Sequence, residues 1–103
     1  MIKSIMADKK IIDETHIITT KRGNGQLRRE VWTDDKGRVT RYNLAYINHN
    51  LKQSDNGRVL GYDNQHSYHH RHYFGKVEAI SFSSFGAIEE AFENDWIQLR
   101  NKT

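Results

Sequence analysis

The fold is decided near the C-terminus, by the stretch FGAIEEAFENDWIQL at residues 85–99. Its large apolar side chains recur every three or four residues, which is the spacing of one face of an α-helix: Phe85, Ile88, Phe92, Trp96 and Leu99. Either Ser83 or Ser84 can cap the first turn. We therefore predict one long helix over residues 84–101, with its apolar stripe packed into a core rather than around a cofactor.

The residues before this helix alternate between apolar and polar in the manner of β-strands. In the clearest case, residues 38–48, the side chains of Tyr42, Leu44 and Tyr46 share one face. We predict further strands at residues 10–19, 26–33, 58–62 and 76–82. The turn sequence DDKG at 34–37 joins two of them at the spacing of an antiparallel hairpin. The sequence thus predicts an α+β fold: an antiparallel β-sheet of about five strands with one long C-terminal helix packed on it.

The chain length and composition fit one small domain. We assign residues 1–103 to a single domain, with N-terminal strands in 1–50, an Asp-Asn and histidine-rich segment at 61–74, and the helix at 84–101. Hydrophobic residues make up 36% of the chain, which predicts a modest core. Cysteine is absent, so disulfides, thiolate metal ligands and thiol catalysis are excluded. Without a signal peptide or a membrane-length apolar segment, we expect a soluble cytoplasmic protein that does not contact membranes.

Charge is distributed unevenly along the chain. Residues 1–82 carry fourteen Lys and Arg against nine Asp and Glu, whereas residues 83–103 carry two against four. A basic body beside an acidic segment suits a polyanion on one side and a different partner on the other. The simpler interpretation, which charge alone favours, is a C-terminal helix with a solvated acidic face.

The strongest chemical signal is the segment YDNQHSYHHRHYF at residues 62–74, which holds four of the six histidines. Imidazole exchanges protons near neutral pH, so two histidines facing one phosphodiester can act as base and acid in RNA cleavage without a metal. If residues 69–73 are extended, His70 and His72 share one face, and His69 and Arg71 share the other. Asp63 can orient a histidine by a hydrogen bond, and Arg71 can neutralise transition-state charge.

These arguments define two sets of candidate residues. The proposed catalytic residues are Asp63, His66, His70, Arg71 and His72. The proposed substrate-binding residues would contact single-stranded RNA through positive charge, stacking and hydrogen bonds: Arg28, Arg29, Arg41, Tyr62, Asn64 and His69. His16 and His49 stand alone in the sequence, and we assign them no role.

Two other interpretations of the histidine segment stay open. Asp63, His66, His70 and His72 are side chains of the kind that bind zinc, nickel or manganese, although their spacing matches no established zinc motif. Alternatively, a segment rich in Asn, Asp, Ser and His is a solvated turn, and Asp63-Asn64 is often found in Asx turns. We favour a functional site, because four clustered histidines add no hydrophobic stabilisation and would repel one another when protonated.

Several of these segments together resemble the TumE family of small bacterial toxins. The resemblance covers residues 38–97: the strand YNLAYI at 42–47, the turn GYDN at 61–64, the clustered histidines, and the helix from Phe85 through Phe92 to Trp96. Asp-Asn followed by histidines is its most specific part. The resemblance implies a toxin encoded beside a helix-turn-helix antitoxin protein that binds it. By analogy with other small toxins, it also implies a ribonuclease.

The leading hypothesis is therefore the toxin component of a bacterial toxin–antitoxin system that acts as a metal-independent endoribonuclease through histidine acid/base chemistry. Its expected partners are RNA and the antitoxin, with no cofactor, and an oligomer is compatible with the sequence. One alternative is a non-catalytic nucleic-acid-binding or regulatory module. The other is a metal-dependent nuclease that uses Asp63 and the histidine cluster.

Overall fold

Six antiparallel strands, one α-helix and three short 3-10 helices make up the computed structural model, which describes residues 8–102. Each strand pairs with the next one along the chain, so the order in the sheet equals the order in the sequence. The elements are β1 (Lys9–Ile17), β2 (Gln26–Thr33), β3 (Val39–Ile47), β4 (Arg58–Asp63), β5 (His70–Tyr73), β6 (Lys76–Ala79) and α1 (Phe85–Lys102). The predicted α+β fold is confirmed, with six strands in place of about five.

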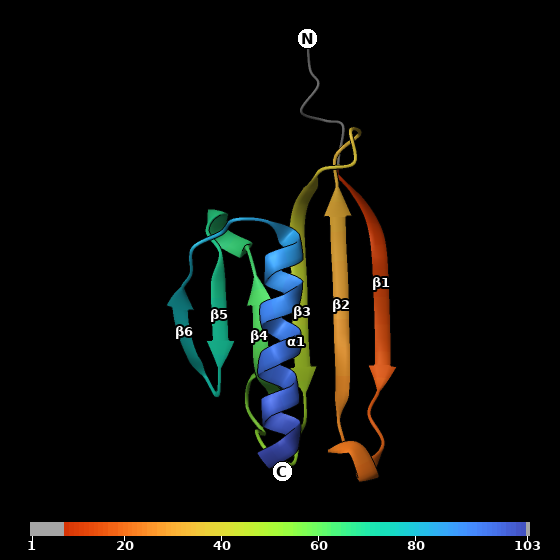
Figure 1. The fold of residues 1–103 in the computed structure, drawn as a ribbon, viewed down its shortest axis with the longest axis vertical. Coiled ribbons are helices and arrows are strands. Elements are labelled where there is room, and N and C mark those ends of the chain that lie inside the picture. Colours follow the sequence, from red (N-terminus) through yellow and green to blue (C-terminus); the bar gives the residue numbers. More distant parts are fainter. Residues whose placement is uncertain (1–7, 103) are drawn as a thin grey trace.

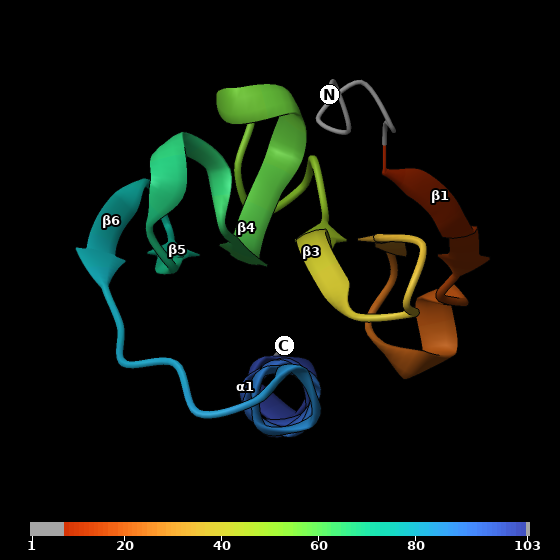
Figure 2. The ribbon, with the colours of Figure 1, turned by 90° about the horizontal axis from the view of Figure 1, so that it is seen from above.

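The helix lies on one face of the sheet and packs mainly on β3 and β4 (Figure 1). The sheet curves around it, so that α1 occupies the concave side and no other element described in residues 8–102 covers the convex side (Figure 2). We call these the helix face and the open face. The helix begins after Ser84, whose Oγ accepts a hydrogen bond of 3.1 Å from the Ala87 amide, as a capping serine does.

The hydrophobic core lies between the helix and the central strands. Apart from Val59, which lies at a register shift between β3 and β4, its buried members come from alternate positions of the strands and from one stripe of the helix: Tyr42, Leu44, Tyr46, Val59, Leu60, Tyr62, Ile88 and Leu99. The ring of Trp96 meets Tyr46 edge-on, and the ring of Phe92 meets Tyr62 edge-on. Because this core fills the helix face, the polar partners of β3 and β4 are displayed on the open face.

The extra strand, β5, has the sequence His70-Arg71-His72-Tyr73, which contains no aliphatic residue. Hydrophobic alternation therefore gives no signal for it. Its side chains are held instead by charged partners on both faces, and its backbone pairs with β4 and β6. No helix in the described range 8–102 is both long and apolar enough to cross a membrane.

A histidine, aspartate and arginine cluster on the open face

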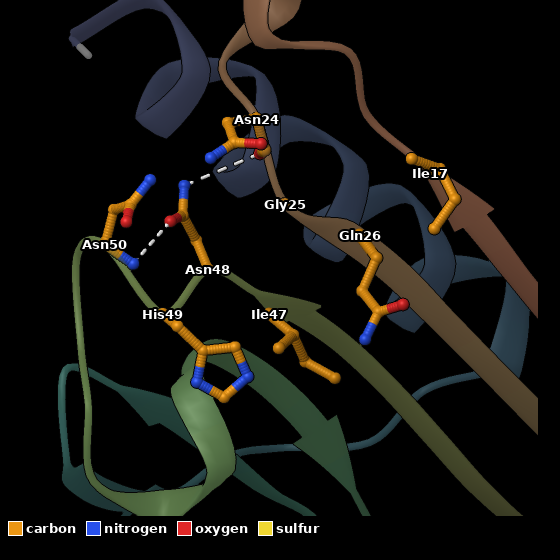
Figure 3. A pocket seen from close by; sticks show the side chains of 8 residues that line it. All are labelled: Ile17, Asn24, Gly25, Gln26, Ile47, Asn48, His49 and Asn50. Atoms are coloured by element: carbon orange, nitrogen blue, oxygen red, sulfur yellow. Dashed lines mark hydrogen bonds between the residues drawn. The ribbon is translucent and has the colours of Figure 1, made fainter.

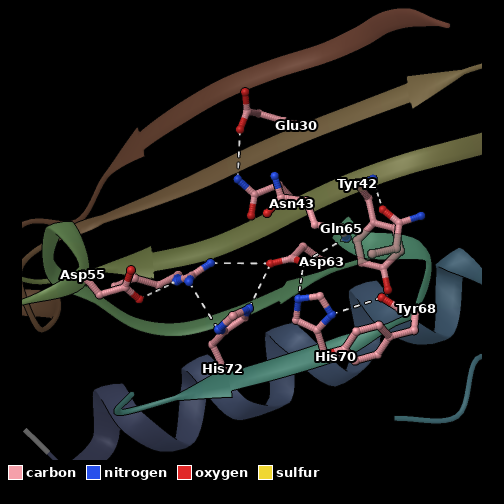
Figure 4. A network of polar contacts seen from close by, with 11 residues as sticks. Glu30, Tyr42, Asn43, Asp55, Asp63, Gln65, Tyr68, His70 and His72 are labelled. Atoms are coloured by element: carbon pink, nitrogen blue, oxygen red, sulfur yellow. Dashed lines mark hydrogen bonds and ion pairs between the residues drawn. The ribbon is translucent and has the colours of Figure 1, made fainter. Parts of the chain in front are cut away.

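Strand register brings three of the predicted catalytic side chains together. In the antiparallel pair of β4 and β5, Asp63 lies opposite His70, and Gly61 lies opposite His72. Side chains alternate between the two faces of a strand, so Asp63, His70 and His72 all project from the open face. Figure 4 shows Asp63 between the two imidazole rings. The prediction that His70 and His72 share one face is confirmed.

One carboxylate holds both histidines. His70 Nε2 lies 2.6 Å from Asp63 Oδ1, and His72 Nε2 lies 3.0 Å from Asp63 Oδ2. The two rings meet edge-on, with their centroids 4.9 Å apart. The Asp63 and His70 side chains are each 5% exposed and the His72 side chain 13%, so solvent screens these contacts little.

Arg58 completes the cluster, and the sequence analysis did not identify it. Its Nη2 lies 3.2 Å from His72 Nδ1, and its Nη1 lies 3.5 Å from Asp63 Oδ2. The side chain reaches them by lying flat across Gly61, where a Cβ would be only 2.9 Å from Arg58 Cδ. Asp55 accepts a hydrogen bond of 3.0 Å from its Nε and fixes the other edge of the guanidinium. The sequence contains one signal for the position of Arg58: Gly61 lies between Arg58 and Asp63 on the same strand.

The partners of His72 define its protonation state. Arg58 is only a donor, so His72 Nδ1 must accept, and the ring proton then lies on Nε2, from which it is donated to Asp63. Burial, together with the positive charge of Arg58, lowers the pKa of His72 and outweighs the opposite effect of Asp63. His72 is therefore a neutral imidazole with its basic nitrogen beside a guanidinium.

The partners of His70 define the complementary state. Its Nδ1 lies 3.0 Å from the carbonyl oxygen of Tyr68, and its Nε2 faces the Asp63 carboxylate. Both partners are acceptors, so both contacts are hydrogen bonds only when the ring carries two protons. The two rings on this carboxylate therefore differ in their second partner: His72 Nδ1 faces a donor, and His70 Nδ1 faces an acceptor.

A small hollow opens beside the cluster. It has a volume of about 200 Å³, and Arg58 and Asp63 form part of its wall. Across the hollow lie Trp32 and Arg41, which occupy directly opposed positions on β2 and β3. The hollow therefore borders the Arg58 and Asp63 side of the cluster, and neither His70 nor His72 lines it.

Arg71 is not part of this cluster. It pairs with Tyr62 in the strand register, and its side chain projects from the helix face. There its Nε donates a hydrogen bond of 2.9 Å to Asp95, and its Nη1 donates one of 3.0 Å to Glu78. The arginine beside the histidines is Arg58, not Arg71. Arg71 therefore lies apart from the two histidines with which it was grouped in the prediction.

The other predicted residues of the Asp-Asn and histidine segment lie nearby but apart from the cluster. His66 is exposed in a short 3-10 helix, and it lines a second, wider hollow instead. The ring of His69 stacks on Phe82 with centroids 4.0 Å apart, and burial lowers its pKa. Asn64 joins two strands, because its Oδ1 accepts from the Tyr42 amide at 3.0 Å and its Nδ2 donates to the Thr40 carbonyl.

The remaining predicted RNA contacts divide between the two faces. Arg28 lies on the open face, where it pairs with Asp13 and Glu30, and Arg41 lies exposed on the same face. Arg29 lies on the helix face and pairs with Glu89. Tyr62 is buried on the helix face, where its hydroxyl donates to Asp95 at 2.6 Å. The structure thus brings only two of these four residues to the face that carries the cluster.

A metal ion would have one set of ligands in this region. Asp63, His70 and His72 each offer one ligand atom, all within 4.8 Å of one another. A carboxylate with two imidazoles is a donor set that suits zinc. The guanidinium of Arg58 already places a positive charge against the same carboxylate oxygen, however, and it would repel a divalent cation.

A further hollow of about 220 Å³ lies at the opposite end of β3, between the turn at Asn24-Gly25 and the segment 48–50 (Figure 3). Its central side chain, Asn48, is buried and has its amide committed. The amide nitrogen donates to the Gly23 carbonyl at 3.2 Å, and the amide oxygen accepts from the Asn50 backbone at 2.9 Å. These bonds tie two loops together, so this hollow is part of the scaffold.

The fold and the cluster together define a small α+β protein whose sheet carries a histidine, aspartate and arginine site on its open face. A family model described as Toxin TumE matches residues 5–101, well beyond the 38–97 that carry the resemblance in sequence. The chain therefore belongs to the TumE toxin family. It is the toxin component of a toxin–antitoxin pair, and its partner in that pair is an antitoxin protein. No curated protein and no solved structure matches the chain.

Proposed function

We propose that this toxin is a metal-independent endoribonuclease that cleaves RNA through its 2′-hydroxyl. The observation that carries the proposal is the contrast between the hydrogen-bond partners of two histidines on one carboxylate. His72 has an accepting nitrogen beside Arg58, and His70 has two hydrogen bonds that require two protons. A base and an acid set side by side are what transesterification of RNA needs.

In the proposed reaction, the phosphate takes over the Arg58 Nη2 hydrogen bond from His72 Nδ1, and His72 Nδ1 then accepts the proton of the 2′-hydroxyl as the oxygen attacks phosphorus. A bond forms between phosphorus and the 2′-oxygen, and the bond to the 5′-oxygen of the next nucleotide breaks. His70 supplies the proton that the leaving 5′-oxygen takes up. The products are a 2′,3′-cyclic phosphate and a 5′-hydroxyl, so protons and charge balance without a further reactant.

Arg58 and Asp63 have supporting roles in this scheme. The Arg58 guanidinium lies beside the basic nitrogen of His72, where it can bind the phosphate and stabilise the charge that builds on it. Asp63 is a positioning residue: it holds both rings through their Nε2 atoms, so that the Nδ1 atom of His72 faces Arg58 and that of His70 faces the Tyr68 carbonyl. The same guanidinium supplies the positive charge that a metal ion supplies in other nucleases, which supports a metal-independent reaction.

The test is cleavage of purified single-stranded RNA by the full chain with a strong chelator present. We expect wild-type protein to cleave, and the His72→Gln variant to lose about 10²- to 10⁴-fold in rate, the usual contribution of one general base. His16→Gln is the matched control, because His16 is an exposed histidine of β1 far from the cluster in the sheet order. It should cleave like wild type.

The alternative functions predict different outcomes of the same experiment. Cleavage that stops on chelation and returns with added Zn²⁺ or Mn²⁺ would indicate a metal-dependent nuclease built on Asp63 and the two histidines. RNA binding without cleavage would indicate a non-catalytic binding module. Full cleavage by His72→Gln would show that the reaction occurs elsewhere. Growth of cells that express wild type or His70→Ala/His72→Ala gives the corresponding test of toxicity.

A further inference from the structure

We propose that the open face holds a nucleobase-binding site at Arg41, beside the cluster, and that this site makes single-stranded RNA the substrate class. The inference rests on the proposed function, because it concerns how the same site takes its substrate. It follows from the stacking of Arg41 on Trp32, from two adjoining hollows, and from the exposed side chains that line them.

Arg41 forms the platform of the proposed site. Trp32 and Arg41 are directly opposed on β2 and β3, and the central carbon of the Arg41 guanidinium lies 4.5 Å from the centre of the Trp32 ring. Trp32 is half-buried, whereas Arg41 is exposed. The guanidinium thus lies over one face of the indole, and the exposed Arg41 side chain remains accessible from solvent. Nucleobases stack on such planes, and the positive charge at the same position attracts the RNA backbone.

The two hollows of this region meet at Arg41. The smaller one, of about 200 Å³, is lined by Trp32, Arg58 and Asp63, and leads to the cluster. The larger one, of about 550 Å³, is lined by Thr40, Asn64, His66 and His69 and is within the size range of small-ligand sites. Arg41 and Gln65 line both. A base on Arg41 would therefore be next to the position where the proposed reaction cleaves the phosphate.

The walls of the larger hollow combine fixed and available polar groups. The Asn64 amide is committed at both ends to neighbouring backbone, so it forms a rigid wall. Gln65 and His66 are exposed, and neither side chain has a hydrogen bond within the described chain. An amide and an imidazole each offer both a donor and an acceptor, so they can bind the polar edge of any base. The site therefore selects an unpaired base rather than one particular base.

A paired base cannot enter this site. In a duplex, each base is stacked on both sides, and its hydrogen-bonding edge is occupied by its partner strand. Its edge and face become available only where the strand is unpaired. If Arg41 receives a base, RNA that binds at the cluster must be single-stranded next to the cleaved bond.

The test uses Arg41→Lys, which keeps the positive charge but removes the planar group that stacks. The probe is a short synthetic RNA with 2′-O-methyl groups, which cannot be cleaved, offered as a single strand or annealed to its complement. Fluorescence anisotropy then gives the two dissociation constants for each protein. Arg38→Lys is the matched control, since Arg38 precedes the same strand, its side chain is 73% exposed, and it lines neither hollow.

We expect wild type to bind the single strand at least tenfold more tightly than the duplex. Arg41→Lys should lose about tenfold for the single strand, as expected for one stacked base, with the duplex unchanged. Arg38→Lys should stay within about twofold of wild type, the size of a surface change. Quenching of Trp32 fluorescence by the single strand, absent in Trp32→Phe, gives an independent readout of stacking.

Three results overturn the proposal. They are equal affinity of wild type for the two RNAs, unchanged single-strand binding in Arg41→Lys, or an equal loss for single strand and duplex. Any of these, with cleavage by wild type intact, refutes the base site and leaves the proposed function standing. If wild type neither binds nor cleaves RNA, the proposed function fails and the base site fails with it.

Discussion

Strands β4 and β5 carry two clusters that share the same ingredients on opposite faces. On the helix face, Asp95 accepts hydrogen bonds from Arg71 at 2.9 Å and from the Tyr62 hydroxyl at 2.6 Å. On the open face, Asp63 binds two histidines beside Arg58. Each cluster has one carboxylate, one arginine and at least one ring, yet their surroundings differ. The first lies against a helix, and the second borders an approach from solvent.

The different surroundings of the two clusters give their side chains different hydrogen-bonding patterns. Asp95 belongs to α1, whereas Arg71 and Tyr62 belong to the sheet, so their bonds fasten the helix to the strands. Burial beside Asp95 raises the pKa of Tyr62 to about 12, and the hydroxyl remains a donor at all physiological pH values. In the Asp63 cluster, burial and Arg58 lower the pKa of His72 instead, and leave it with an accepting nitrogen. One cluster keeps its hydroxyl proton, and the other contains a nitrogen that accepts a hydrogen bond.

The largest expected effect separates activity from stability at His72. His72→Gln keeps a side-chain donor for Asp63 but has no basic nitrogen. RNA cleavage should therefore fall by about 10²- to 10⁴-fold. The free energy of unfolding should change by no more than about 1 kcal/mol, because a Gln amide can still donate to Asp63 and accept from Arg58. Single-turnover cleavage and urea unfolding on the same preparation check both. A variant that unfolds in proportion to its lost activity contradicts the assignment.

The opposite result is expected at Asp95. Asp95→Ala leaves the donors of Arg71 and Tyr62 unpaired in a half-buried position, which should cost about 1–3 kcal/mol of unfolding free energy. Cleavage per folded molecule should stay at the wild-type rate. Urea unfolding measures the first, and activity at a temperature where the variant is folded measures the second. A loss of cleavage in the folded variant would place Asp95 in the site.

The lowered pKa values of His72 and His69 predict a pH effect on stability. Both groups bind a proton less readily when folded than when unfolded, where the ordinary pKa is about 6.5. The unfolded chain therefore holds more protons at mildly acidic pH. The free energy of unfolding should be fully retained above about 6.5 and fall as the pH decreases through the lowered values. Urea unfolding across this range should show a shallower decline in His72→Gln, and an identical decline would contradict the prediction.

The smallest expected effect compares two neighbouring arginines. Arg28 projects from the open face and Arg29 from the helix face. If RNA lies on the open face, Arg28→Gln should reduce the slope of log affinity against log salt by about 0.7, the value for one contact with a single-stranded phosphate. Arg29→Gln should leave the slope unchanged. Anisotropy titrations over a range of salt concentrations measure it, and equal slopes in the two variants would remove the distinction between the faces.

Much of the fold could be predicted from the sequence, because the spacing of the apolar residues indicates both the strands and the helix. Alternation on β3 placed Tyr42, Leu44 and Tyr46 in the core, and the spacing of three and four residues placed the α1 stripe against them. Strand β5 was not predicted, since its four side chains are stabilised by partners distant in sequence rather than by apolar burial.

Part of the site could also be predicted from the alternation of side chains along a strand. Alternation alone places His70 and His72 on one face and Arg71 on the other, and this is what the structure shows. Which arginine meets the histidines depends on cross-strand register and on the path that Gly61 opens for Arg58. Protonation states depend on which partner each ring nitrogen meets, so they too required the structure.

We propose that the open-face cluster cleaves RNA through the 2′-hydroxyl, with His72 as base. The most direct measurement is mass spectrometry of the ends that the purified full chain produces on a single-stranded RNA with a chelator present. We predict 2′,3′-cyclic phosphate and 5′-hydroxyl ends, and none of them with His72→Gln. Ends that carry a 3′-hydroxyl and a 5′-phosphate, or the same cyclic ends from His72→Gln, would contradict the account.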